Sequence, residues 1–226
     1  MIGIIGAMQT EVDLLISKIE DAKTRTVSGI DFVSGKIHTK DVVVARCGIG
    51  KVFAALCAQT MILEYGVEML VNTGVGGAIS DELDIGDITV SDFVVQHDMD
   101  TTALGDPAGL ISGINVVKIA ADADIVSSFC RAAEREGARY IVGTIASGDT
   151  FVSSAEKKKQ IADLFGAAVC EMEGAAIGQV CYVNRVPFCI VRAVSDKADG
   201  SSGVDYMTFV AAAAEKNARV ILEFLK

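Results

Sequence analysis

Acidic side chains recur in this chain at the ends of apolar segments. Glu11 follows the opening run MIGIIGAM, and three later segments carry an acid in the same place: SGDTF (147–151), CEMEGAA (170–176) and IVRAVSD (190–196). Carboxylates are costly to remove from water, so their concentration where buried segments end indicates a site in which charge serves binding or acid–base chemistry.

Each of these acids also has a structural interpretation. Taken alone, such a residue is more often a helix cap or an ion-pair partner than a catalyst. Asp196 could cap the turn that follows it, and Glu171 and Glu173 could pair with Arg192. The repetition of the same placement favours the functional interpretation.

Apolar runs rich in Val and Ile alternate with amphipathic helical patterns along the chain. The predicted strands are Ile2–Ile5, Val42–Ala45, Met69–Val71, Ile88–Val95, Tyr140–Ile145 and Phe188–Val194. The predicted helices are Glu11–Ile19, Lys51–Tyr65, Ala123–Glu136, Ala155–Phe165, Met172–Val183 and Tyr206–Leu225. This alternation predicts an α/β fold, a three-layer α/β/α domain with helices on both faces of a largely parallel sheet.

In such folds ligands bind beyond the carboxyl ends of the strands. The groups that follow predicted strands are Glu11, Gly74–Gly77, Asp149, Glu171, Glu173 and Asp196. We therefore expect them to converge on one rim of the sheet. The segment from His97 to Ile119 has little periodicity and predicts a long loop, a feature that usually serves as a lid, binding loop or interface element.

Length and composition exclude several classes of protein. With 226 residues and no linker-like stretch, the chain predicts a single domain over residues 1–226. The net charge of −10 opposes sequence-independent binding to nucleic acid or to an anionic membrane, because both depend on clustered Lys and Arg. No basic stretch precedes the first apolar run, and Glu11 and Asp13 follow it closely, so we expect no signal sequence and a cytoplasmic location.

The number and spacing of the cysteines and histidines argue against metal-dependent and histidine-based catalysis. Six cysteines lie singly in apolar segments without a C-x-x-C pair, which predicts buried, reduced thiols rather than a zinc site or disulfides. Only His38 and His97 are present, which excludes a histidine-based metal centre and a Ser–His catalytic triad. We therefore expect neither a metal nor another cofactor.

Two glycine clusters resemble phosphate-binding turns but lack their defining residues. At Gly48–Val52 a P-loop would need an earlier glycine and a final Ser or Thr, where this chain has Ala45 and Val52. At Gly74–Gly77 a dinucleotide fingerprint would need a third glycine, where Ile79 stands. Both clusters predict tight turns, and the second would also let a small ligand approach the backbone.

Eight segments, in order, resemble one enzyme family. They are GIIGAMxxEV (3–12), CGIGKV (47–52), NTGxGG (72–77), GDIxVSD (86–92), HDMDxT (97–102), SGDxF (147–151), EMEGAA (171–176) and VRAVSD (191–196). Together they make the chain similar to the 5'-methylthioadenosine/S-adenosylhomocysteine nucleosidases of the purine nucleoside phosphorylase and hydrolase superfamily, from its first residues to about Phe209.

The resemblance implies both a fold and a reaction. The fold is a twisted mixed sheet flanked by helices, with the site at the strand ends. The reaction is hydrolysis of the N-glycosidic bond of 5'-methylthioadenosine, S-adenosylhomocysteine and 5'-deoxyadenosine. No cofactor is required, because carboxyl groups can both protonate the base and activate water.

By resemblance, three acids divide this work. Asp196 delivers a proton to adenine N7, Glu11 activates water, and Glu173 binds the ribose hydroxyls. Asp196 must therefore hold or relay a proton near neutral pH, with Ser195 as a nearby partner, whereas Glu11 must stay ionised with support from Arg192. A carboxylate on a ribose hydroxyl binds more strongly as positive charge develops on the sugar, so Glu173 would favour the transition state.

The resemblance also implies which residues surround the substrate. The Phe151 ring and the backbone of Phe151 and Val152 would bind adenine near Gly77, while Met8 and Met172 would contact the ribose, although core positions explain these methionines equally well. The predicted substrate-binding residues are Met8, Ile49, Gly76, Gly77, Phe151, Val152, Glu171, Met172, Arg192, Ser195, Tyr206 and Phe209.

Two residues favour hydrolysis over phosphorolysis. Glu11 would repel a phosphate dianion, and Ile49 would close the water side of the site, where a phosphorylase binds phosphate. Arg46, which precedes the same turn, favours the opposite interpretation.

The chain departs from the family pattern around the attacking water and the 5' group. Val75 stands where the family often has a serine that helps hold the water. GLISG (109–113) replaces GQxPG in a loop that, in the family, completes the 5' pocket of the partner subunit. Tyr206 and Phe209 stand where the family has phenylalanines, and the Tyr206 hydroxyl would admit a longer or more polar 5' group.

Other functions are open at this stage. A futalosine-type nucleosidase would use the same acids with a different 5' substituent, and a purine nucleoside phosphorylase would need phosphate. A binding module without chemistry is disfavoured, because Glu11 and Asp196 are both present. The resemblance and the high apolar fraction also predict a homodimer. The resemblance alone implies that its partner is a small adenine nucleoside.

Overall fold

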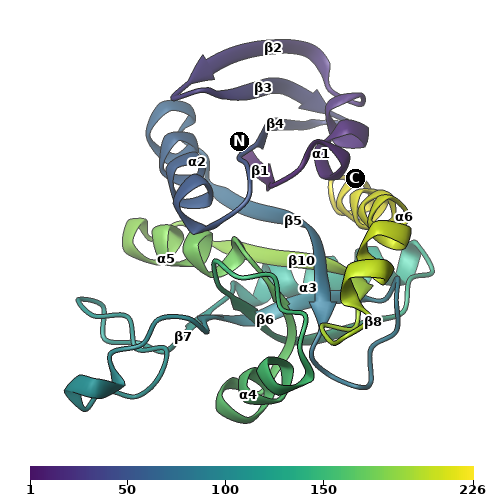
Figure 1. Cartoon of the computed structure of the whole chain (residues 1–226). Helices are drawn as coiled ribbons and strands as arrows, with labels where there is room; N and C mark the ends of the chain where they lie inside the picture. Colours follow the sequence, from purple (N-terminus) through teal and green to yellow (C-terminus); the bar gives the residue numbers. More distant parts are fainter.

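The computed structural model describes residues 1–226 (Figure 1). Its strands are β1 (Ile2–Gly6), β2 (Glu20–Val27), β3 (Ile30–Ile37), β4 (Lys40–Arg46), β5 (Met69–Ala78), β6 (Ile88–Gln96), β7 (Lys118–Ala120), β8 (Tyr140–Ser147), β9 (Ala167–Glu171) and β10 (Phe188–Asp196). Its helices are α1 (Gln9–Ile16), α2 (Lys51–Tyr65), α3 (Ala123–Arg135), α4 (Ala155–Phe165), α5 (Gly174–Asn184), α6 (Ser202–Phe224) and the 3-10 helix η1 (Thr102–Leu104). None of these helices combines the length and the apolar character needed to cross a membrane.

All strands belong to one sheet, in the order β10-β6-β8-β9-β5-β1-β4-β3-β2, with β7 beside β6. β10 also pairs with β5, so β5, β10, β6, β8 and β9 close into a ring. Parallel and antiparallel pairs both occur, which confirms the mixed sheet. The expectation of a largely parallel sheet is wrong, because antiparallel pairings are needed to close the ring.

Side chains along the inner strands alternate between two apolar layers. Ile4 of β1 and Val44 of β4 pack with α1, α3 and α6, whereas their neighbours Ile5 and Val43 pack with α2 and α5. Successive strand residues point to opposite faces, so this alternation places helices on both sides of the sheet. The α/β/α layering is therefore confirmed. All six cysteines are unpaired, and five of them are buried.

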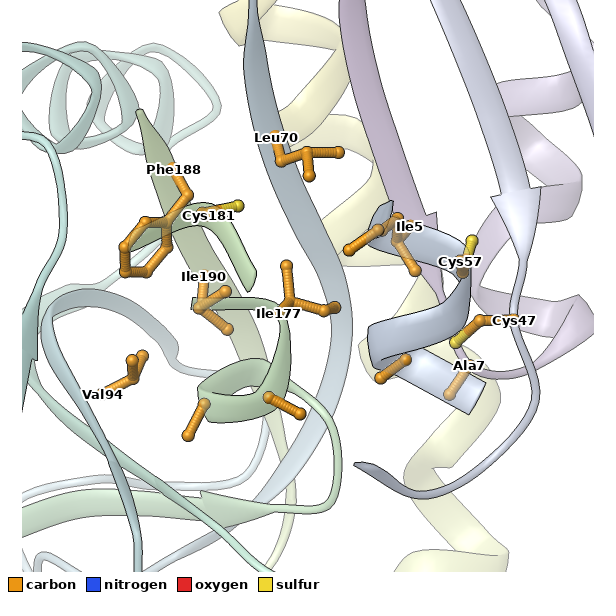
Figure 2. Close-up of a cluster of buried hydrophobic side chains, with 14 of the residues drawn as sticks. Ile5, Ala7, Cys47, Cys57, Leu70, Val94, Ile177, Cys181, Phe188 and Ile190 are labelled. Carbon is orange, nitrogen blue, oxygen red and sulfur yellow. The ribbon is translucent and has the colours of Figure 1, made fainter. Parts of the chain in front are cut away.

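Figure 2 shows part of the layer that contains α2 and α5. Cys57 of α2 and Ile177 of α5 lie in one cluster with Ile5 of β1 and Leu70 of β5. All four side chains are fully buried. Burial of a large aliphatic side chain stabilises a fold by roughly 1.5–3 kcal/mol, so this layer fixes the strands whose ends carry the acids.

The edge hairpin β2–β3 was not predicted by the apolar pattern. Nearly all of β2 is exposed, so neither of its faces carries apolar alternation. Ser28 and Gly29, between the two strands, both have positive φ, at 52° and 77°. A two-residue type I′ hairpin turn requires this backbone conformation, and the Ser–Gly pair is the sequence signal that could have identified the hairpin.

Several predicted boundaries are wrong. β5 continues through Gly74–Gly77, so the turn predicted there is part of a strand. α5 begins at Gly174 rather than Met172, and α6 begins at Ser202 rather than Tyr206. The short strand β9 was also not predicted. All five of its residues are buried, so it shows no alternation of apolar and polar side chains.

The segment between β6 and β7 is long and irregular, as expected. It contains η1 and an isolated bridge between Ile111 and Val116, and it ends in β7, a strand that was not predicted. In Figure 1 this teal segment extends away from the rest of the protein at the lower left. Leu104 in η1 is 83% exposed.

Candidate active site

A cavity of about 390 Å³ lies at the carboxyl ends of β1, β5, β8, β9 and β10. This volume is in the usual range for small-molecule sites. The predicted site residues that line it are Met8, Glu11, Ile49, Gly76, Gly77, Phe151, Val152, Glu171, Met172, Glu173, Ser195, Asp196 and Tyr206. The convergence expected for Glu11, Glu171, Glu173 and Asp196 is therefore confirmed.

Two predicted substrate-binding residues do not line the cavity. Arg192 is fully buried behind Glu171, and Phe209 lies on the partly exposed side of α6. The lining residues outside the predicted set are Ala7, Val75, Thr150 and Cys170. Val75 was already singled out by the resemblance as a position near the attacking water. Ala7, Thr150 and Cys170 are each a chain neighbour of a predicted residue, which is the only sequence signal that could have identified them.

Three backbone N–H groups hold the Glu11 carboxylate. Ala7 and Met8 donate to Oε2 at 2.8 and 2.9 Å, and Val75 donates to Oε1 at 3.0 Å. A Cβ atom on Gly74 would lie 2.6 Å from Oε1. The carboxylate therefore fits against β5 only because residue 74 has no side chain, which explains a glycine inside this strand.

Opposing effects act on the proton affinity of Glu11. Burial raises the pKa of Glu11 above its ordinary value, while the Arg192 charge and the three N–H donors act to lower it. The donors fix the position of the oxygens, and the loss of solvation makes the carboxylate a stronger base than one in water. Glu11 is thus placed and tuned to accept a proton.

The charge of Glu171 is neutralised within the protein. Its carboxylate accepts hydrogen bonds from the backbone N–H groups of Glu173 at 3.0 Å and Gly174 at 2.8 Å, at the start of α5. The Ser147 hydroxyl and the Arg192 guanidinium donate to it as well. The predicted pairing with Arg192 is confirmed. Glu171 therefore anchors α5 and Arg192 and has little hydrogen-bonding capacity left for a ligand.

Glu173, two residues further on, is in a different state. Gly50 N–H donates to its Oε1 at 2.9 Å, and Arg192 lies 3.9 Å from its Oε2. Burial, and then the charge of Glu171, raise the pKa of Glu173 to about 8. This value lies above neutral pH and favours the protonated form of the carboxyl group, whereas the sequence led us to expect a carboxylate.

Asp196 ends β10 and is held on both of its oxygens. The Ser195 hydroxyl donates to Oδ2 at 2.9 Å, and the Ala198 N–H donates to Oδ1 at 2.9 Å. Ala198 is fully buried and has a φ of 52°, an uncommon conformation for a residue with a side chain. A Cβ atom on Gly77 would lie 2.9 Å from Oδ1, so this glycine also makes room for an acid.

The cavity thus has two kinds of lining. The acidic wall is formed by Glu11, Glu173 and Asp196, and the apolar wall by Met8, Ile49, Phe151 and Tyr206. Phe151 and Tyr206 meet edge to face with ring centroids 5.5 Å apart. Ile49 and Phe151 are about half exposed, so the apolar wall reaches the protein surface.

Asp149 does not join the acidic wall, contrary to expectation. Its Oδ1 accepts the Lys51 N–H at 2.8 Å at the start of α2, and its own N–H donates to Asp98 Oδ2 at 2.9 Å. Lys51 Nζ pairs with Asp98 Oδ1 at 2.7 Å. We call these three residues the Lys51 cluster. It ties the segment before Phe151 to α2, so Asp149 has the capping role that a single acid more often has.

Comparison with known proteins agrees with this geometry. Residues 1–226 match the family model described as the phosphorylase superfamily. A curated 5'-methylthioadenosine/S-adenosylhomocysteine nucleosidase of Shewanella halifaxensis is 40% identical over 227 residues, which cover 100% of this chain and 98% of that protein.

Two solved structures are similar along their whole length. One is the Neisseria meningitidis 5'-methylthioadenosine/S-adenosylhomocysteine nucleosidase in complex with methylthio-immucillin-A, with a TM-score of 0.96, 35% identity and coverage of 100% of this chain and 98% of that one. The other is the futalosine hydrolase of Helicobacter pylori, with a TM-score of 0.94, 33% identity and coverage of 99% and 96%. The chain belongs to the 5'-methylthioadenosine/S-adenosylhomocysteine nucleosidase family of the phosphorylase superfamily.

Proposed function

We propose that residues 1–226 form a single nucleosidase domain that hydrolyses the N-glycosidic bond of 5'-methylthioadenosine and S-adenosylhomocysteine, and also of 5'-deoxyadenosine. The products are adenine and the corresponding 5-substituted ribose. The observation that carries the proposal is the acidic wall: three buried carboxyl groups, each held by different donors, face one cavity of nucleoside size. Relatives that match the whole chain are named for this activity.

Asp196 and Glu11 handle the two protons of the reaction. Asp196 donates a proton to adenine N7, so that the base leaves as a neutral molecule when the bond between N9 and C1' breaks. Glu11 removes a proton from water, and the water oxygen forms a bond to C1'. The proton that Asp196 gives up is restored from solvent, and Glu11 returns its proton there, so the net change is the addition of one water.

Glu173 binds the ribose hydroxyls. Burial and the charge of Glu171 raise its pKa to about 8, which favours its protonated form at neutral pH. Positive charge that develops on the sugar favours the ionised form of this carboxyl group, and an ionised oxygen accepts a stronger hydrogen bond from a hydroxyl. Glu173 therefore releases this proton to solvent as the transition state forms and takes one back after the products leave, so the net reaction is unchanged.

The surroundings of α2 support hydrolysis over phosphorolysis. The first backbone N–H groups of a helix are a common anion site, but here Glu173 and Asp149 already accept hydrogen bonds from Gly50 and Lys51. Arg46, which favoured a phosphate site in the sequence, is exposed and outside the cavity lining. A phosphate dianion would therefore meet carboxyl groups instead of donors.

A futalosine-type nucleoside is the second candidate substrate. The Helicobacter pylori futalosine hydrolase matches 99% of this chain, so the same fold accommodates that activity in a relative. Both activities need the acidic wall, and their substrates differ in the group attached at the 5' carbon. Product analysis with each nucleoside separates them.

We also propose that the protein is a homodimer that associates through α2 and α5. These helices lie side by side at the left of Figure 1 and are joined by a hydrogen bond of 3.0 Å between Asn184 and Gln59. Their outer faces expose Val52, Phe53, Leu63, Tyr182 and Val183. A concentration of exposed apolar side chains on two neighbouring helices is typical of an interface. Light scattering on the Val52→Asp variant should detect monomers where the parent chain gives dimers.

The test of the reaction is adenine release from 5'-methylthioadenosine, with and without phosphate, and with identification of the sugar product. Release without phosphate and free 5-methylthioribose are expected. Release that depends on phosphate and yields the sugar 1-phosphate would instead mean a phosphorylase. If futalosine is cleaved and 5'-methylthioadenosine is not, the second candidate takes precedence.

A further inference from the structure

Tyr206 places a hydroxyl group in the apolar wall of the cavity. The other members of this wall are Met8, Ile49 and Phe151, none of which has a polar hydrogen on its side chain. The hydroxyl points to the sulfur of Met8, with a distance of 3.0 Å between Oη and Sδ. The ring is held edge-on against Phe151, so the hydroxyl has a defined direction.

The hydrogen bond to Met8 is a weak one. A thioether sulfur is a poor acceptor, so the Tyr206 hydroxyl is only partly satisfied by its contact with Met8. Burial, and then the negative charges of the acidic wall, raise the pKa of Tyr206 above its ordinary value, so the hydroxyl keeps its proton. The Tyr206 hydroxyl can therefore exchange its weak hydrogen bond to Met8 for one to a ligand with little loss of free energy.

The substrate contacts proposed above decide which ligand atom this donor meets. The family resemblance implies that Met8 contacts the ribose and that Phe151 stacks on adenine, and Tyr206 touches both of these side chains. A donor beside both the sugar and the base faces the first atoms attached to the 5' carbon. In 5'-methylthioadenosine that position holds another thioether sulfur, which gains little from a hydroxyl donor.

We propose that Tyr206 is a specificity-determining residue that lets this enzyme accept adenine nucleosides with an oxygen at the 5' position, either a hydroxyl or an alkoxy group. This inference rests on the proposed N-glycosidase function. An oxygen buried against an apolar wall without a partner is penalised, whereas the Tyr206 hydroxyl supplies that partner. A phenylalanine at residue 206 would leave the same oxygen unpaired and would disfavour it relative to sulfur.

The experiment uses two substrates that differ in one atom, 5'-methylthioadenosine and 5'-methoxy-5'-deoxyadenosine. The quantity measured is the ratio of kcat/KM for the oxygen substrate to that for the sulfur substrate. In Tyr206→Phe this ratio should fall roughly fivefold to tenfold, the effect of one lost hydrogen bond to an oxygen. Tyr140→Phe, which removes a hydroxyl bonded to Glu134 outside the cavity, serves as the matched control and should keep the parent ratio.

The outcomes separate this inference from the proposed function. If the parent enzyme cleaves neither nucleoside, the proposed function fails. If it cleaves 5'-methylthioadenosine but its oxygen-to-sulfur ratio is below about 0.01, or if Tyr206→Phe leaves the ratio within about twofold, only the inference about Tyr206 is overturned. Tyr206→Leu is a second variant in which the ratio must also fall. If neither variant folds, the ratio measured on the parent enzyme still tests the inference.

Discussion

The acidic wall and the Lys51 cluster hold carboxylates in similar sequence positions but in different environments. In both, the acids follow strands and belong to segments of the family pattern. Glu11, Glu173 and Asp196 are buried, and no lysine pairs with them. Asp98 and Asp149 are exposed, and both make contacts with Lys51.

The two environments shift proton affinity in opposite directions. Burial raises the pKa of Glu11 and Glu173. For Asp98, burial raises the pKa too, but the Lys51 ammonium and the Asp149 N–H outweigh it and hold the value below the ordinary one. The Arg192 charge acts on both Glu11 and Glu173 but does not offset their burial, so these two carboxyl groups bind a proton more tightly than they would in water. A carboxyl group that is hydrogen-bonded to lysine stays charged and fixes geometry.

The strongest test of the comparison is Asp196→Asn in the acidic wall. The amide keeps the shape of the side chain but cannot donate a proton as an acid, so kcat should fall about 10²–10⁴-fold. Nucleoside affinity should change much less, because the cavity is otherwise intact. Single-turnover adenine release and calorimetric binding of 5'-methylthioadenosine measure the two effects. Near-normal turnover would exclude Asp196 as the proton donor.

Glu11→Gln should be the next most damaging change, with turnover reduced on the order of 10²-fold. The amide is not a base, and its NH₂ group would face N–H donors that now bind a carboxylate. Adenine release as a function of time measures the loss. Asp13→Asn, on the exposed side of the same helix, is the control. Equal activity of the two variants would remove Glu11 from the mechanism.

The sequence predicts this contrast only in part. The periodicity of apolar residues indicates which side chains are buried, but not which distant residues they contact. Ile4 and Ile5 reveal a strand buried on both faces, so the layers could be predicted. β2 is exposed on both faces and carries no such signal. The closed ring depends on the pairing of β10 with β5, which is a long-range contact that no local pattern encodes.

The same limit applies to the acids. Glu171 and Glu173 are separated by one residue, and nothing local to the sequence EME distinguishes them. The difference arises because Ser147 and Arg192, from β8 and β10, both reach Glu171. Asp149 was likewise expected at the site, and only the position of α2 shows that it caps a helix instead. The order of the motif segments identified the family. The packing of distant strands and helices decides which acid has few partners within the protein and can therefore bind a ligand.

The pH dependence of stability tests the raised pKa of Glu173. Its value rises from 4.5 to about 8 on folding, so between these pH values the folded protein holds a proton that the unfolded chain has lost. Stability must therefore fall as pH rises through this window, by up to about 1.4 kcal/mol per pH unit from this group. Denaturant unfolding from pH 5 to pH 8 should show a smaller decline for Glu173→Gln than for the parent chain.

Glu156→Gln, an exposed acid in the first turn of α4, is the control for that series. It should keep the slope of the parent chain. If Glu173→Gln also keeps the parent slope, the Glu173 carboxyl group is ionised in the folded protein. The contrast between the acidic wall and the Lys51 cluster is then weaker than the burial of Glu173 implies.

The smallest expected effect is that of Lys51→Met in the Lys51 cluster. The lysine side chain is about one-fifth exposed and pairs with Asp98, so its loss should cost up to about 1 kcal/mol. The cluster holds the segment before Phe151 and contacts no reacting atom, so the loss should raise KM roughly twofold to fivefold and leave kcat nearly unchanged. Lys159→Met breaks a more exposed pair with Asp163 on α4 and should alter neither constant. A fall in kcat for Lys51→Met at constant KM would show that the Lys51 cluster acts on the chemical step. The carboxylates of this cluster would then do more than fix geometry, and the distinction from the acidic wall would be wrong.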